Sequence, residues 1–180
     1  MLRTARRMTT TVAAVALTLS GLSACGGDAE QKASDKIVEK ALENGSGGDV
    51  DVDTSDDQVT VDTEDGTVAV GQDVDLPDRF PDSIPMPLAD HTITSASTQG
   101  DEMAVLVSLT DADVDLDAEK EHLVSGLTTG GWTVDEPFSS AGGGAEQLIL
   151  TATTDGWGLQ VVVSVADGEA MAAYTLGAGD

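Results

Sequence analysis

The chain is poor in the residue types on which catalysis, metal binding and nucleic-acid recognition most often depend. Its 180 residues include one cysteine, two histidines and eight lysines or arginines, against 33 aspartates and glutamates. A single cysteine excludes an intramolecular disulfide. Nucleic-acid binding needs clustered basic side chains interleaved with aromatics, and aromatics make up only 3% of this chain. The composition therefore excludes nucleic-acid binding and disfavours anionic ligands in general.

Candidate catalytic groups are also scarce. Nucleophilic catalysis needs a nucleophile, a base and an orienting group, yet His91 and His122 are the only histidines and no serine lies in a Gly-x-Ser-x-Gly motif. Neither histidine has the spacing of a zinc site. We predict no catalytic residues, no metal ligands and no cofactor. We expect His122 on a helix surface. A metal site at His91, beside Asp90, and a hydrolase using paired carboxylates stay as alternatives.

The N-terminus has the pattern of an export signal. Arg3, Arg6 and Arg7 form a positive segment, and the apolar stretch from Thr11 to Leu22 is too short to span a bilayer of about 30 Å. We predict that residues 1–24 are a signal peptide. Its removal leaves five basic residues against 33 acidic ones, a formal net charge of −28. No later apolar run reaches transmembrane length.

The only cysteine follows this signal directly. Leu22-Ser23-Ala24-Cys25 resembles the lipobox of bacterial lipoproteins, in which the thiol receives a diacylglyceryl group and becomes residue one. The resemblance implies lipidation at Cys25 and attachment to the extracytoplasmic face of the cell membrane. Two or three acyl chains anchor stably, whereas one holds only marginally. The alternative is an ordinary secreted protein cleaved after Ala24, which would begin with an unpaired thiol in an oxidising compartment.

The first segments after the signal are acidic and weakly apolar. Residues 25–48 form a spacer and a short helix over 30–43, which Asn44-Gly45 ends. Residues 49–75 hold a repeat of alternating valines separated by acidic turns, which predicts a three-stranded meander with six valines on one face. A buried valine contributes about 1.5–3 kcal/mol, while ordering one backbone residue costs about 1–2 kcal/mol. This meander must therefore dock on another element or stay partly disordered.

Two acidic runs raise the alternative of cation binding. Asp49, Asp51 and Asp53 resemble the opening of an EF-hand loop, but Thr54 and Thr60 stand where that loop needs Gly and Glu. The second run precedes a predicted helix and consists of Asp111, Asp113, Asp115 and Asp117. Acids at this place cap the helix amides and complement the helix dipole. We therefore interpret the first run as the solvent-exposed face of a strand and the second as the N-terminus of a helix.

The last hundred residues have the pattern of a small domain. Residues 76–90 hold four of the five prolines and form an extended strap with interleaved apolar residues. Residues 91–180 predict strands at 91–97 and 102–110, a helix from Asp115 or Asp117 to Gly130-Gly131, and further strands from 132 onward. The predicted fold class is α+β: an antiparallel sheet with one packed helix in the order ββαβββ, preceded by the short helix and the acidic meander. We expect Trp132 and Trp157 to be core or edge anchors, with sugar stacking as the alternative.

Several of these features together resemble a family of uncharacterised lipoproteins common in actinobacteria. They are the lipobox, the acidic repeat ending in Asp65-Gly66-Thr67-Val68, and the strap followed by a ββαβββ domain whose helix ends over 127–132. The resemblance implies an envelope location and no established activity. It supplies no catalytic residues.

We therefore expect a non-enzymatic envelope lipoprotein that is held to the lipid bilayer through Cys25 and binds a protein or small ligand at the cell surface. A cation-binding acidic lipoprotein, with calcium as the typical ion, is the first alternative. A hydrolase acting on envelope material is the second.

Overall fold

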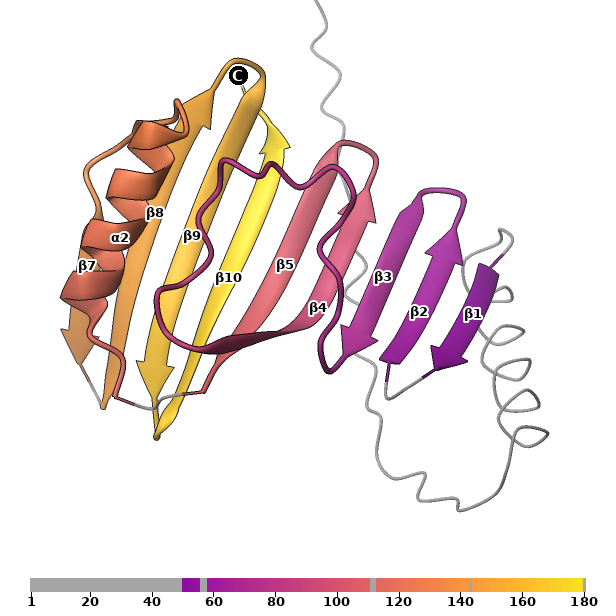
Figure 1. The fold of residues 1–180 in the computed structure, drawn as a ribbon, viewed down its shortest axis with the longest axis horizontal. Coiled ribbons are helices and arrows are strands. Elements are labelled where there is room, and N and C mark those ends of the chain that lie inside the picture. The colour runs from indigo at the N-terminus through magenta and orange to yellow at the C-terminus, as the bar shows by residue number, and fades with distance from the viewer. Residues whose placement is uncertain (1–49, 56–57, 111–112, 143, 180) are drawn as a thin grey trace, which may run out of the picture.

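The structure is a computed structural model that describes residues 50–55, 58–110, 113–142 and 144–179. Within these ranges the chain forms ten strands and one helix, α2 (Leu116–Thr129), shown in Figure 1. The first strands are β1 (Val50–Ser55), β2 (Gln58–Thr63), β3 (Gly66–Gly71), β4 (His91–Gln99) and β5 (Glu102–Leu109). After α2 follow β6 (Thr133–Val134), β7 (Phe138–Gly142), β8 (Ala145–Thr154), β9 (Trp157–Ala166) and β10 (Glu169–Ala178).

All ten strands belong to one antiparallel sheet. Their order is β1-β2-β3-β4-β5-β10-β9-β8-β6, and β7 pairs with the other half of the β8 edge. We call β1–β3 the wing and β4–β10 with α2 the domain. Residues 72–90 are the strap, which joins the two by crossing in front of the sheet in Figure 1.

The predicted α+β class is wrong, because the described chain is mostly one sheet with a single helix. The meander is not a separate unit: β3 pairs with β4 at five positions, from Gly66↔Gln99 to Val70↔Ser95. This pairing satisfies backbone groups that both strands would otherwise leave at an edge. Five strands rather than three follow α2. The short helix predicted at 30–43 lies outside the described residues.

The core lies on one face of the domain. Alternate residues of β5 are buried, namely Met103, Val105, Val107 and Leu109. Leu123 and Leu127 of α2 cover them, each fully buried, and each contributes about 1.5–3 kcal/mol. From the strap, Phe80 and Ile84 enter the same cluster, so the strap packs against the domain.

The helix begins at the first of the two cap residues that the sequence offered, Asp115 and Asp117. Asp115 is the N-cap residue, and its Oδ1 accepts hydrogen bonds from the N–H groups of Asp117 and Ala118 at 3.0 and 3.1 Å. Such a cap is worth about 1 kcal/mol. The predicted end of the helix is confirmed as well, since Gly130 is the C-cap and Gly131 has a positive φ of 87°.

Polar contacts fasten the strap to the domain at three points before its end. Trp132 Nε1 donates to Ser83 Oγ at 3.0 Å, and the Tyr174 hydroxyl donates to the Pro85 carbonyl at 3.2 Å. His122 Nε2 lies 3.0 Å from the Met86 carbonyl oxygen. These contacts satisfy polar atoms that packing would otherwise leave without partners.

Glu119 holds the end of the strap. Its side chain is the one buried charged group among the described residues. Its carboxylate accepts the N–H groups of Leu88 at 3.0 Å and Ala89 at 2.8 Å. Two hydrogen bonds to a charged acceptor explain how a carboxylate is tolerated on the buried stripe of α2.

Candidate functional site

The residues on which the predicted lipid anchor depends lie outside the described part of the chain. These are Leu22, Ser23, Ala24 and Cys25. Asp49 and Asp111, from the two acidic runs, also lie outside it. Lipidation at Cys25 therefore stays a prediction.

The side chains of both histidines lie within hydrogen-bond distance of backbone carbonyls of the strap. His91 Nδ1 lies 2.9 Å from the Ala89 carbonyl oxygen, and His122 is half-buried against the strap rather than on a free helix surface. No group of three or more His, Cys, Asp or Glu side chains that could hold a metal ion occurs among the described residues. The structure does not bring either histidine into such a cluster.

Phe80, Trp132 and Tyr174 are part of the core, whereas Phe138 is exposed. Trp132 is buried, which leaves no ring face open for sugar stacking, whereas Trp157 is half-buried at the start of β9. Tyr174 packs edge-on against Phe80 with ring centroids 6.1 Å apart. Burial raises the pKa of the Tyr174 hydroxyl well above its usual value, and the nearby negative charge of Glu119 adds to the effect. This phenol is held neutral inside the core.

The acidic residues of the wing lie on the strap-side face of the sheet. Register pairs Asp51 with Asp62, and Asp62 with Thr67, on the same face as the domain core. Asp62 Oδ1 accepts the Thr67 hydroxyl at 2.5 Å. The valines of the wing therefore lie on the opposite face of the sheet.

That opposite face, which we call the open face, is where the structure leaves apolar side chains uncovered. In Figure 1, α2 and the strap both lie on the other side of the sheet. Three rows of paired residues cross the open face. The first row runs Phe138, Ile149, Val162, Ala173, Leu106, Ser95, Val70, Val59, Thr54. The second runs Thr151, Gln160, Thr175, Ala104, Ser97, Val68, Val61, Val52, and the third Ser140, Gln147, Ser164, Met171, Ser108, Thr92.

These three rows contain no charged residue, although the chain has 33 acidic ones. Glu102 and Glu169 lie on the same face, one row beyond them at either end. Seven large hydrophobic side chains are exposed among the described residues, and five of them lie on the open face. The five are Val68, Val70, Leu106, Phe138 and Met171, with exposed fractions from 38% to 61%. The solvent face of an antiparallel sheet is normally polar. Three adjacent rows without a charged residue are unusual on the surface of so acidic a molecule.

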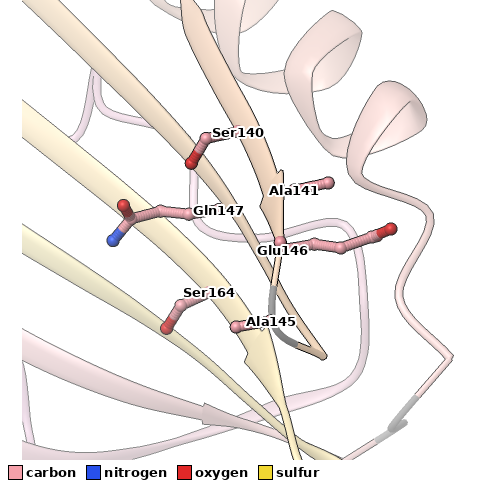
Figure 2. Close-up of a pocket in the computed structure, with 7 residues that line it drawn as sticks. Ser140, Ala141, Ala145, Glu146, Gln147 and Ser164 are labelled. Carbon is pink, nitrogen blue, oxygen red and sulfur yellow. The ribbon is translucent and has the colours of Figure 1, made fainter.

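A shallow hollow of about 360 Å³ lies where the open face meets β7 (Figure 2). Ser140, Gln147 and Ser164 point to one side of the sheet there, while Ala141 and Glu146 point to the other. Its lining includes the hydroxyls of Ser140 and Ser164, but Glu146 points to the other side of the sheet, so no carboxylate faces these hydroxyls there.

Comparison with known proteins adds no relative. No family model, characterised protein or solved structure was found to match the chain. Within the residues that the structure describes, no helix is both long enough and apolar enough to cross a membrane.

Sequence reasoning missed the open face and β7. The signal for the face was the alternation of valine with aspartate in the wing, which indicates one apolar face but not the side of the sheet on which it lies. The signal for β7 was weak, because Phe-Ser-Ser-Ala-Gly has the composition of a loop.

Proposed function

We propose that this chain is a lipid-anchored, non-enzymatic lipoprotein of the bacterial envelope whose open face docks a protein partner at the membrane surface. The anchor rests on the lipobox and on Cys25 as the only cysteine. The docking rests on one observation: the three rows of the open face contain no charged residue and carry five of the seven exposed large hydrophobic side chains of the described residues.

The size of the open face supports a protein partner. Its rows hold nine, eight and six residues, which together compare with the roughly 20–30 residues that each partner contributes to a standard interface. The face carries hydroxyls among its apolar residues. The matching partner surface is largely apolar, and it lacks acidic residues that would meet the acids around this sheet.

A matched pair of substitutions tests the docking. Leu106→Asp places a charge at the centre of the open face, while Leu76→Asp places the same charge on the strap; the two leucines are 38% and 37% exposed. Crosslinking in intact cells, followed by purification, should recover a partner with the wild type and with Leu76→Asp. Recovery of the partner with Leu106→Asp should fall at least about tenfold, because docking would bury an unpaired charge, which is strongly unfavourable.

The outcomes also separate other occupants of the face. Equal recovery with both variants contradicts docking at the open face. Crosslinks from Leu106 to residues 30–43 of the same chain assign the face to an intramolecular cover, and crosslinks to lipid alone assign it to the membrane; both overturn the proposal.

The anchor is tested separately. Cys25→Ser should release the protein from the membrane or leave its precursor unprocessed, which fractionation and mass spectrometry distinguish. A mature form that stays on the membrane without this thiol refutes the lipid anchor.

A further inference from the structure

The two edges of the sheet differ in how they are protected. Natural edge strands usually carry charges, prolines or bulges that prevent pairing with another chain. The edge strand β1 carries the exposed Asp51 and Asp53. The strand β7 has neither charge nor proline, and all five of its residues are exposed. It pairs with β8 on one side and, among the described strands, with none on the other.

The surroundings of β7 are acidic and hollowed. Asp135 and Glu136 precede the strand and are exposed, and Glu146 lies opposite Ala141 in the register. The hollow of about 360 Å³ lined by Ser140 and Gly142 lies beside it.

Positive charge is absent from this edge. The described residues include two lysines or arginines, and both form ion pairs elsewhere: Arg79 with Asp101 at 3.3 Å and Lys120 with Asp117 at 2.6 Å. A second copy of this chain, with its formal charge of −25, would be repelled. Charge complementarity therefore favours a cationic partner segment.

We propose that β7 receives an extended peptide segment bearing lysine or arginine, which pairs with it as an added strand. Main-chain hydrogen bonds to β7 would supply the affinity, and the basic side chains would meet Asp135, Glu136 and Glu146. The inference goes beyond the proposed function and stands on the β7 edge alone, since Leu106 of the open face lies on β5, three strands away from β8.

The test uses the full chain in mild detergent and a ten-residue peptide of alternating threonine and valine with lysine at both ends. Backbone amide chemical shifts are followed by NMR during titration. We expect shifts concentrated at residues 138–142. The same peptide with glutamate in place of lysine should bind at least about tenfold more weakly. A peptide N-methylated at every residue should not bind, because it keeps no N–H group that could pair with β7.

Two proline variants make the test specific to the edge. Consecutive residues of a strand point their N–H groups to opposite sides, so one of Ser139→Pro and Ser140→Pro removes a bond to β8 and the other removes an outward donor. The variant that keeps the wild-type melting temperature should lose peptide affinity about tenfold. Leu106→Asp should leave peptide binding unchanged, which separates this inference from the docking of the open face.

Several results overturn the proposal. They are the absence of shifts at millimolar peptide, shifts concentrated at β1 instead of β7, and equal binding of the lysine and glutamate peptides. Concentration-dependent shifts at 138–142 without peptide would assign the edge to a second copy of the chain and overturn it as well.

Discussion

The wing and the domain share one sheet but turn their apolar sides in opposite directions. In the domain, the alternate apolar residues face α2 and the strap and are buried. In the wing, the valines lie on the open face, and Asp51, Asp53 and Asp62 lie on the strap side. The comparison shows that strand pairing can continue across a sheet beyond the strands whose side chains form the core. The wing therefore adds mainly surface to the molecule, although Val52 is buried at 7% exposure.

The change of side begins at β4. In the domain register, Ile93 pairs with Val107 and Ala96 pairs with Val105, so two residues three positions apart share the core face. A β-bulge between Ile93 and Ser95 accommodates the extra residue. The bulge decides which residues of β4, and hence of β3, face the core.

The largest expected effect comes from removing the contact between Glu119 and the end of the strap. Glu119→Ala leaves the Leu88 and Ala89 N–H groups without their acceptor, and the free energy of unfolding should fall by about 2–4 kcal/mol. Glu119→Gln keeps one acceptor oxygen and should lose less. Denaturant unfolding measures both. Equal losses for the two variants would show that side-chain packing, rather than the hydrogen bonds, holds this end of the strap.

The next effect compares equal deletions in the two regions. Val107 is fully buried in the domain and Val70 is 48% exposed in the wing. Val107→Ala should cost about 2 kcal/mol, because it removes buried methyl groups and leaves a cavity. Val70→Ala should change stability by no more than about 0.5 kcal/mol. Chemical denaturation of both variants gives the values. A similar cost for both would mean that the wing has a core of its own.

A third substitution disturbs the pairing of β3 with β4, where the wing joins the domain. A Cβ atom at Gly66 would lie 1.8 Å from the Thr98 carbonyl oxygen of β4, so the backbones must separate. Gly66→Ala should cost about 1–3 kcal/mol and raise hydrogen exchange at β3 and the facing half of β4. Exchange at β8 to β10 should stay unchanged. Uniform loss of protection over all strands would contradict the view that wing and domain are separable.

The smallest expected effect is the pH dependence of stability that Tyr174 of the domain causes. The pKa of Tyr174, the only tyrosine, is raised by burial, so the unfolded state ionises first as pH rises. Stability is fully present below the usual pKa of 10.0 and is lost above it, at about 1.4 kcal/mol per pH unit. Tyr174→Phe should lack this additional slope. Tyrosinate absorbance reports the ionisation, and ionisation of the folded protein near pH 10 would contradict the burial effect.

Sequence patterns predicted most elements because their signals are local. Alternating valines predicted β1 to β3, alternation from Met103 to Leu109 predicted β5, and the acidic run predicted the start of α2 at Asp115 or Asp117. They did not predict that the meander joins the domain sheet. Its partner β4 is rich in serine and threonine, so no apolar alternation sets the register between Val68 and Ser97. The bulge changes which residues of β4 face the core, and the amino-acid composition gives no sign of it. Residues 138–142 form a strand only because they pair with β8.

The most direct test of the central claim, that the open face docks a partner, is oxidative footprinting of the protein in intact native cells and after purification. Met171, Leu106 and Val68 should be labelled less in cells than in the purified protein, while Leu76 and Leu88 on the strap are labelled equally in both. Equal labelling of the open face in the two samples would contradict the claim.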